Sequence, residues 1–457
     1  MTATEQKLFV FTYLDTEWVP CGQLTLSEDG VKLLASTFAY GLRYLQRPGA
    51  LEVDPVSLSL RDMDRVRGTA LFPPNNLPLF GGIRDAAPDA WGRRVIESRL
   101  KVPANSLPES SYLLHAGSQR VGAIDIRSSR DSAATLGFGT WDNLEYLMDA
   151  AQRIDEGLPV PAPLEEIFAE GSALGGARPK ATVRDEERVL WLAKFPSRKD
   201  ALLVPVLETA TLRLAAASGL TVPPVRLVHF GSRTVMLIRR FDRYWAKAGQ
   251  DAPLPEDLLS TVSAYGLAEK RLGFVSGLTL LACDEMESPN KSYGDLAQAV
   301  RRYCHPRVIR ENNRELFERL VFNIFVNNDD DHLRNHGFVW DPRLPGWRLS
   351  PLYDVMPRAS LAPERRLHLG VGPQGRIATL DNALAGREMF TLSAEAAAES
   401  VARIWRIVRE WKVYFEEYQV PSHQIERIAP AFRHIDDLST RSASSVVSRC
   451  AGGTRFF

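Results

Sequence analysis

Three consecutive carboxylates, Asp329, Asp330 and Asp331, stand between apolar runs at 321–326 and 337–340. Carboxylates beside buried segments are costly unless something neutralises them, and a divalent cation is the usual neutraliser. An acidic cluster in a loop can also be an ordinary solvated turn or helix cap. The apolar flanks favour a metal-dependent site over the solvated turn.

The spacing of the polar residues in this segment points to one kind of chemistry. Asn335 follows Asp330 by five positions, which gives the pattern D-x-x-x-x-N. Protein kinases use this interval in a loop where the Asp accepts the proton of the substrate hydroxyl and the Asn holds a metal ion. A second metal-binding carboxylate is then expected shortly downstream at a strand end, and Asp354 occupies that place. We therefore expect Asp330 to be a catalytic base and Asn335 and Asp354 to bind metal.

Two histidines in the same segment raise the alternative of a zinc hydrolase. His332 and His336 are four residues apart, as in zinc sites of the H-E-x-x-H type. No Glu lies between them, so the catalytic base of such a site is missing. The sequence predicts instead that His332 braces the loop, and it leaves the role of His336 open.

A glycine-rich segment at 171–180 is a candidate phosphate-binding loop. Gly175, Gly176 and Ala177 would let backbone N–H groups approach a phosphate, and Lys180 adds positive charge. The segment matches neither a Walker A motif nor G-x-G-x-x-G, and most glycine-rich turns are only turns. Its significance therefore depends on the residues that follow it.

The apolar run at 189–196 carries one lysine, Lys194. A lysine inside such a strand is costly to bury unless it is paired. In kinases a strand lysine contacts the phosphates of ATP and pairs with a helix glutamate, for which Glu208 is the candidate here. An edge strand with a solvated lysine is the alternative.

The pattern of apolar residues predicts the elements that carry these groups. Strands are expected at 8–14, 18–26, 38–40, 181–183, 189–196, 225–230 and 233–238. Helices are expected at 85–96, 204–215, 314–326 and 394–418. Four Pro and Gly residues at 157–163 indicate a domain boundary near there. The order of glycine-rich loop, strand lysine, helix glutamate and Asp/Asn loop is more specific than any one of these features.

Composition sets outer limits on the function. The 56 basic and 56 acidic residues balance, so no general attraction to nucleic acid or membrane is indicated. The four cysteines are far apart and form no CxxC pair, which suits a reducing cytoplasm. No signal-like N-terminus and no apolar run of about 20 residues is present, so no membrane association is expected.

Several of these motifs occur together in a known family. They are residues 80–94 and 120–124 in the N-terminal part, and the segments 176–180, 193–196, 240–243, 330–335 and 352–354. With them, the sequence resembles the HipA family, the serine/threonine kinase toxins of HipA–HipB toxin–antitoxin modules. The resemblance covers most of the chain.

The resemblance implies an α+β, two-lobed protein-kinase-like fold with a β-rich N-terminal region and a mostly helical C-terminal lobe. The expected parts are an N-terminal subdomain at 1–128, a kinase N-lobe at 129–243 and a C-lobe at 244–457. The implied cofactors are ATP and Mg²⁺. Asp330 would be the catalytic base, Lys194 would pair with the phosphates, and Asn335 and Asp354 would bind the metal. The expected nucleotide-binding residues are Gly175, Gly176, Ala177, Lys180, Lys194, Arg239 and His332.

The sequence departs from the family at two places. Arg239 stands where relatives often have an acidic residue, in a segment expected to form the hinge that contacts adenine. Ala173 stands where some relatives carry an autophosphorylated serine, and the adjacent Ser172 is the candidate regulatory phosphosite. A phosphate on Ser172 would lower ATP affinity by repulsion or by holding the loop open.

The resemblance also implies partners. A protein substrate is expected, and the family's substrates include aminoacyl-tRNA synthetases. A HipB-like, DNA-binding antitoxin is the expected partner, so DNA would be contacted only through it. Two alternatives remain: a nucleotide-binding pseudokinase or co-repressor acting with a helix-turn-helix partner, and a small-molecule kinase.

Overall fold

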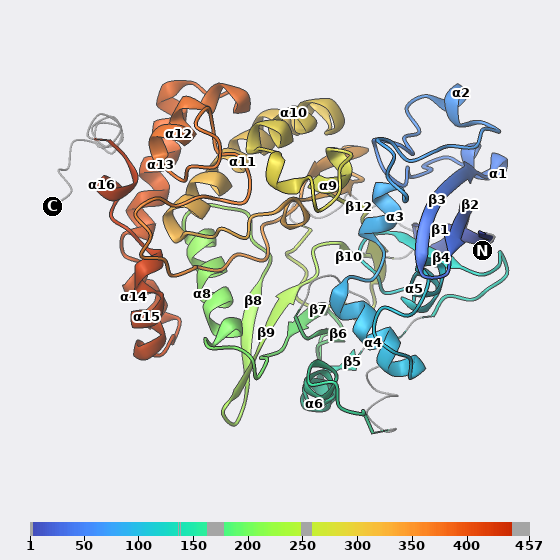
Figure 1. Cartoon of the computed structure of the whole chain (residues 1–457), viewed down its shortest axis with the longest axis horizontal. Coiled ribbons are helices and arrows are strands. Elements are labelled where there is room, and N and C mark those ends of the chain that lie inside the picture. Colours follow the sequence, from blue (N-terminus) through green and yellow to red (C-terminus); the bar gives the residue numbers. More distant parts are fainter. Residues whose placement is uncertain (1–2, 136, 138, 162–177, 248–257, 441–457) are drawn as a thin grey trace. The chain divides into compact units, whose positions relative to one another are not determined.

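Alternating apolar residues near the N-terminus form an antiparallel sheet in the order β3-β2-β1-β4 (Figure 1). The computed structural model describes residues 3–135, 137, 139–161, 178–247 and 258–440. Leu8, Val10, Leu24 and Phe38 lie in one buried cluster on this sheet, because successive strand residues face opposite sides. The strands are β1 (Thr4–Leu14), β2 (Glu17–Asp29), β3 (Lys32–Tyr40) and β4 (Ile124–Arg127).

Short helices follow this meander, and one prediction about them is wrong. The single helix expected at 85–96 is two helices, α3 (Gly81–Asp85) and α4 (Ala90–Leu100). Pro88 lies between them; it lacks an N–H and disfavours helical geometry in the residue before it. Asp89 then caps α4 by accepting a hydrogen bond from the Gly92 backbone N–H. The other helices here are α1 (Leu42–Leu45), α2 (Met63–Val66), α5 (Glu109–His115) and α6 (Leu144–Asp155).

A second sheet carries the candidate lysines. Its order is β5-β6-β7-β9-β8 (Figure 1), and α6 packs on it through Leu144, Leu147 and Met148. The expected strands at 181–183, 189–196, 225–230 and 233–238 are all confirmed. They are β6 (Lys180–Arg184), β7 (Leu190–Lys194), β8 (Val225–Phe230) and β9 (Arg233–Arg239), with β5 (Gly139–Thr140) at one edge. A two-stranded sheet of β10 (Arg243–Ala246) and β11 (Ala268–Arg271) follows.

The chain divides into two compact units. Unit 1 comprises Met1–Asp200, Arg226–Val275 and Val339–Arg343; unit 2 comprises Ala201–Val225, Ser276–Phe338 and Leu344–Phe457. One passage from unit 1 to unit 2 lies in strand β12 (Phe274–Ser276), and one return to unit 1 lies in strand β13 (Gly337–Asp341). The expected three-part division at residues 128 and 243 stays a prediction.

Unit 2 is mostly helical, and α11 (Ile309–Val326) lies at its centre (Figure 1). Leu316, Phe317, Leu320 and Phe325 of this helix are fully buried. The helix expected at 394–418 is instead two helices, α13 (Ala394–Val408) and α14 (Trp411–Glu417). No helix among the described residues is long and apolar enough to cross a membrane. The remaining elements are α8 (Val204–Ala217), α9 (Gly277–Leu280), α10 (Tyr293–Tyr303), β14 (Gly346–Leu349), α12 (Leu380–Ala385), α15 (Ser422–Ile428) and α16 (Ile435–Leu438).

Candidate active site

The acidic loop begins where α11 ends, at Asn327. This residue has φ +52°, a left-handed conformation that Asn tolerates better than most side chains and that commonly ends helices. The Asn327 side-chain amide donates to the carbonyl oxygen of Arg358, and the Arg358 N–H donates back to the Asn327 carbonyl at 3.2 Å. Both backbone groups of Arg358 therefore hold the start of the loop.

The three consecutive carboxylates have three different environments. Asp329 pairs with Arg358 at 2.9 Å, and burial raises the pKa of Asp329 although the arginine opposes this. Asp331 is only 1% exposed, and burial raises its pKa to about 7. The side chain of Asp330, in contrast, is 62% exposed. Asp330 is thus the one carboxylate of the three that is open to an incoming group.

Asn335 lies at the end of the 3₁₀ turn Leu333–Asn335 and holds the loop together. Its side-chain Nδ2 donates to the Asp330 backbone carbonyl at 2.9 Å. The hydroxyl of Tyr353 donates to the Arg334 carbonyl at 2.7 Å, which brings the segment of Asp354 against the segment of Asn335. The five-residue interval therefore places its two ends in direct contact.

The predicted position of Asp354 at a strand end is wrong. Strand β14 ends at Leu349, and Asp354 lies in the irregular segment that follows, with φ +59°. A non-glycine residue at such a φ costs of the order of 1–3 kcal/mol and persists where the surroundings determine it. The Tyr353 hydroxyl, beside this residue, is one such constraint.

The donor groups in this loop fit a magnesium ion better than zinc. Among the described residues, no cluster of three or more His, Cys, Asp or Glu side chains could hold a metal on its own. The Nδ2 of Asn335 is engaged by Asp330, so its Oδ1 is the atom left for a ligand. An amide oxygen and the carboxylate of Asp354 are hard oxygen donors, and Mg²⁺ takes few protein oxygens beside substrate phosphates.

The two histidines differ sharply in their surroundings. His332 is about one-third exposed, and its Nε2 lies 3.9 Å from Asp330 Oδ1. The ring of His332 also meets His368 edge-on, with centroids 5.9 Å apart. His336 is buried, and burial together with the charge of Arg319 lowers its pKa to about 3, so its ring is neutral. The bracing role expected of His332 stays a prediction.

In unit 1 the two candidate lysines lie side by side. Lys180 and Lys194 are direct partners in the antiparallel pair of β6 and β7, so their side chains share one face. Lys180 is buried, with its Nζ 3.7 Å from Asp89 Oδ2. Two like charges opposite each other destabilise a sheet, and an anion beside them reverses that cost. This end of the sheet is therefore suited to a phosphate.

The glycine-rich part of the candidate nucleotide site cannot be compared with its prediction. Gly175, Gly176, Ala177 and Ser172 lie outside the described residues. The first described residue after them, Arg178, forms an ion pair with Asp200 at 2.6 Å.

Arg239 and the R-F-D-R motif that follows it are buried in unit 1. The Arg239 guanidinium donates to the Leu258 carbonyl at 3.3 Å and lies over the Trp245 ring at 5.4 Å. Asp242 binds Arg240 and Arg243 at 2.6 and 2.8 Å. The motif also forms hydrogen bonds with the segment 119–122 of the N-terminal part. The Gly122 N–H donates to the Asp242 carboxylate. Arg240 and Arg243 donate to backbone carbonyls of the same segment. It therefore joins the N-terminal part to the second sheet.

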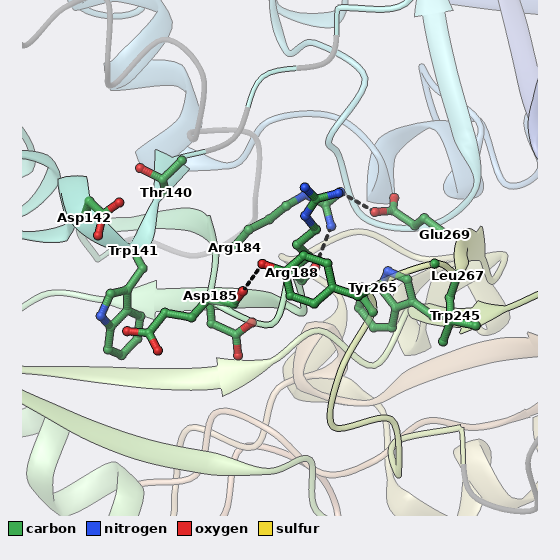
Figure 2. Close-up of a pocket in the computed structure, with 13 residues that line it drawn as sticks. Thr140, Trp141, Asp142, Arg184, Asp185, Arg188, Trp245, Tyr265, Leu267 and Glu269 are labelled. Carbon is green, nitrogen blue, oxygen red and sulfur yellow. Dashed lines mark hydrogen bonds and ion pairs between the residues drawn. The ribbon is translucent and has the colours of Figure 1, made fainter.

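A pocket of about 730 Å³ lies elsewhere in unit 1 (Figure 2). It is located at the turn between β6 and β7, with Trp141 on one side and Tyr265 on the other. Lys194 is at the opposite end of β7, four residues and about 13 Å from Leu190 at about 3.3 Å per residue. The pocket is therefore separate from the candidate phosphate-binding lysines.

Sequence reasoning missed the residues that hold the loop. Arg358 and Tyr353 contact it from beyond β14, and Arg358 belongs to none of the motifs that the sequence shows. The aromatic residue directly before Asp354 was visible, but nothing in the sequence shows that its hydroxyl reaches back 19 residues.

Comparison with known proteins agrees with this architecture. A family profile described as HipA-like C-terminal domain matches residues 172–411. The chain is 26% identical over 183 residues to the putative kinase Y4mE of Sinorhizobium fredii, which covers 39% of this chain and 38% of that protein. It is 26% identical over 152 residues to the serine/threonine-protein kinase toxin HipA of Shewanella oneidensis, 33% of each. The alignments thus span well under half of these relatives.

A solved structure covers nearly the whole chain. The complex of HipA, HipB and operator DNA from Shewanella oneidensis contains a chain that superposes with a TM-score of 0.63, at 16% identity and 96% coverage of both chains. The predicted kinase-like α+β fold, with a β-rich N-terminal region and a mostly helical C-terminal lobe, is confirmed. The family profile spans more than half of the residues, and the chain belongs to the family of proteins with a HipA-like C-terminal domain.

Proposed function

We propose that this chain is an ATP- and Mg²⁺-dependent serine/threonine protein kinase of the HipA toxin kind. The observation that carries the proposal is the environment of Asp330. Its carboxylate is exposed while both neighbouring carboxylates are engaged or buried, and its backbone carbonyl is held by Asn335. A base for a substrate hydroxyl needs an accessible carboxylate on a fixed backbone.

Each candidate residue has a distinct role in the proposal. Asp330 accepts the proton of the attacking hydroxyl and orients its oxygen. Asn335 and Asp354 hold Mg²⁺, which, when bound, neutralises charge on the phosphates. Lys194, with Lys180 beside it, binds phosphate oxygens. Gly175, Gly176, Ala177, Arg239 and His332 remain predicted nucleotide contacts, and Ser172 remains a predicted regulatory phosphosite.

The proposed substrate is a cellular protein whose phosphorylation arrests growth, with aminoacyl-tRNA synthetases as the first class to test. A HipB-like antitoxin is the proposed partner, because the superposed HipA was solved together with HipB and operator DNA. DNA contact would then occur only through that partner. The three described cysteines, Cys21, Cys283 and Cys304, are free thiols, which suits the cytoplasm as the proposed location.

Incubating the purified chain with labelled ATP, Mg²⁺ and a cell lysate tests the proposal. We expect label on protein with the wild type and a loss of about 10²–10⁴-fold in rate with Asp330→Asn, the typical contribution of a positioned base. Asp329→Asn is the matched control, because it removes a neighbouring carboxylate that is paired with Arg358. Equal losses in both variants, label only on small molecules, or no label at all would contradict the proposal.

A further inference from the structure

Asp331 has the same side chain as Asp330, but Asp331 is buried whereas Asp330 is exposed. It is buried inside unit 2, where the His368 backbone N–H donates to its Oδ1 at 2.7 Å. Its other oxygen, Oδ2, has no well-aligned hydrogen-bond partner among the described residues. A buried carboxyl without an ion-pair partner is rare, and it calls for an explanation beyond stability.

Tyr293, in α10, is a neighbour of Asp331: its hydroxyl interacts with the Asp331 carboxyl, and its ring and the Asp331 carbonyl both contact His336. Burial and the neighbouring Asp331 raise the pKa of Tyr293 well above its usual value, while the Tyr293 hydroxyl partly offsets the effect of burial on Asp331. Asn323 of α11 donates to the Tyr293 oxygen at 2.9 Å, and Asn328 donates to Asn323 at 3.1 Å. A chain of buried polar groups thus runs from α11 through Tyr293 to the loop.

Other groups fix the loop around this carboxyl. His336 Nε2 lies 3.3 Å from the Asp331 carbonyl oxygen, and the His336 ring meets Tyr293 edge-on at 5.2 Å. Ser288 Oγ accepts from the Leu333 N–H at 3.3 Å and contacts His368 Nε2 at 2.9 Å. The loop is thereby held by α10, by α11 and by the segment around His368.

The charged and titratable groups that face Asp331 do not neutralise it. His336 is uncharged, because burial and Arg319 lower its pKa to about 3. His368 offers its backbone N–H, and burial lowers the pKa of its ring too. The charge of Arg319 acts on both Tyr293 and His336, but its guanidinium donates to Glu315 and to the Ser350 carbonyl. Asp331 is thus held by hydrogen bonds rather than by an ion pair.

We propose that Asp331 and Tyr293 form a positioning pair, which fixes the backbone from which the neighbouring Asp330 projects. The proposal rests on the proposed function, because its effect is exerted through Asp330 as the base. Asp331 is buried and does not contact substrate. The two residues are adjacent in the chain, so anchoring Asp331 restrains the backbone that orients Asp330. A misplacement of about 1 Å in a reacting group can cost about 10²-fold in rate.

Three variants test the pair. Tyr293→Phe removes the hydroxyl and keeps the ring, and Asp331→Leu removes the carboxyl and keeps the branched skeleton of the side chain. Tyr303→Phe is the matched control, since it makes the same change at the other end of α10. For each, kcat and the KM for ATP are measured together with peptide-resolved hydrogen exchange over residues 329–336.

We expect kcat to fall about 10- to 100-fold in Tyr293→Phe, with the KM for ATP little changed and faster exchange confined to 329–336. Asp331→Leu should do the same, and Tyr303→Phe should resemble the wild type. Wild-type kcat in Tyr293→Phe overturns the pair. So does a parallel loss of kcat and of protection throughout α10 and α11, which would indicate a general structural role.

The exchange measurement separates this inference from the proposed function. If the wild type transfers no phosphate, the assignment of Asp330 fails, but faster exchange at 329–336 in Tyr293→Phe still supports the positioning of the loop. Unchanged exchange in Tyr293→Phe overturns the pair whether or not the protein is active. If Asp331→Leu does not fold, Tyr293→Phe alone decides.

Discussion

Replacing Asp331 by Asn should change the way in which stability depends on pH. Burial raises the pKa of Asp331 from 3.8 to about 7. The folded protein therefore keeps a proton on this carboxyl over a pH range in which the unfolded chain has released it. The stabilisation that this proton provides is complete below about pH 3.8 and is lost as pH rises through about 7. An Asn at this position cannot titrate, so the stability of the variant lacks this decline with rising pH.

The size of the effect follows from the shift. A change from 3.8 to about 7 is about three pKa units, which at about 1.4 kcal/mol each gives about 4 kcal/mol. Screening by solvent removes little of it, because Asp331 is 1% exposed. His336 acts in the opposite direction: burial lowers its pKa to about 3, so stability rises with pH up to its unfolded pKa. The wild type and Asp331→Asn both contain His336, so the difference between their stability curves reports on Asp331.

Urea unfolding from about pH 4 to about pH 8 measures this difference, with pulsed hydrogen exchange in α11 reporting on unit 2 alone. Relative to the wild type, Asp331→Asn should gain about 4 kcal/mol of unfolding free energy across this range. Asp330→Asn is the control, since it makes the same substitution at the neighbouring, largely exposed carboxylate. If the wild type and Asp331→Asn give parallel curves, the buried carboxyl does not titrate as argued.

Three further predictions concern the two units separately. Asp354→Asn should weaken Mg²⁺-dependent ATP binding in calorimetry; Asn tolerates φ +59°, so equal affinity would mean that Asp354 does not hold the metal. Asp242→Asn should destabilise unit 1 by about 3–5 kcal/mol in urea unfolding, because it leaves Arg240 and Arg243 buried without their carboxylate, and unchanged stability would refute this. Asp330→Asn should bind ATP as tightly as the wild type while losing about 10²–10⁴-fold in turnover, and weakened binding would argue against a base.

The sequence predicted the strands well where local pattern decides the outcome. In the second sheet the apolar runs were sufficient to predict the strands at 181–183 and 189–196, but the pairing of Lys180, expected in the glycine-rich loop, with Lys194 was not predicted. The helix at 85–96 failed although Pro88 was visible, because apolar spacing was given more weight than the missing N–H. Local predictions of this kind improve when the missing N–H of proline is weighed together with apolar spacing.

Long-range contacts set the limit of the prediction. The R-F-D-R motif was expected at a hinge, yet its side chains bind carbonyls about 120 residues earlier in the chain. Asp331 likewise depends on two residues that are distant in the sequence. His368 follows it by 37 residues, and Tyr293 lies in the earlier helix α10. No periodicity in the sequence records such pairings, because they depend on how the elements pack.

The acidic cluster shows how the reasoning behind a predicted site can be incomplete. Three adjacent carboxylates suggested that a cation neutralises them. In the structure, Arg358 pairs with Asp329 at 2.9 Å, and burial raises the pKa of Asp331 until it holds a proton near neutral pH. Two of the three charges are thus reduced without a metal. The exposed carboxylate of the three is Asp330, whose backbone is held by Asp331 and by Asn335. The surrounding protein, more than the spacing, selects this carboxylate as the candidate base.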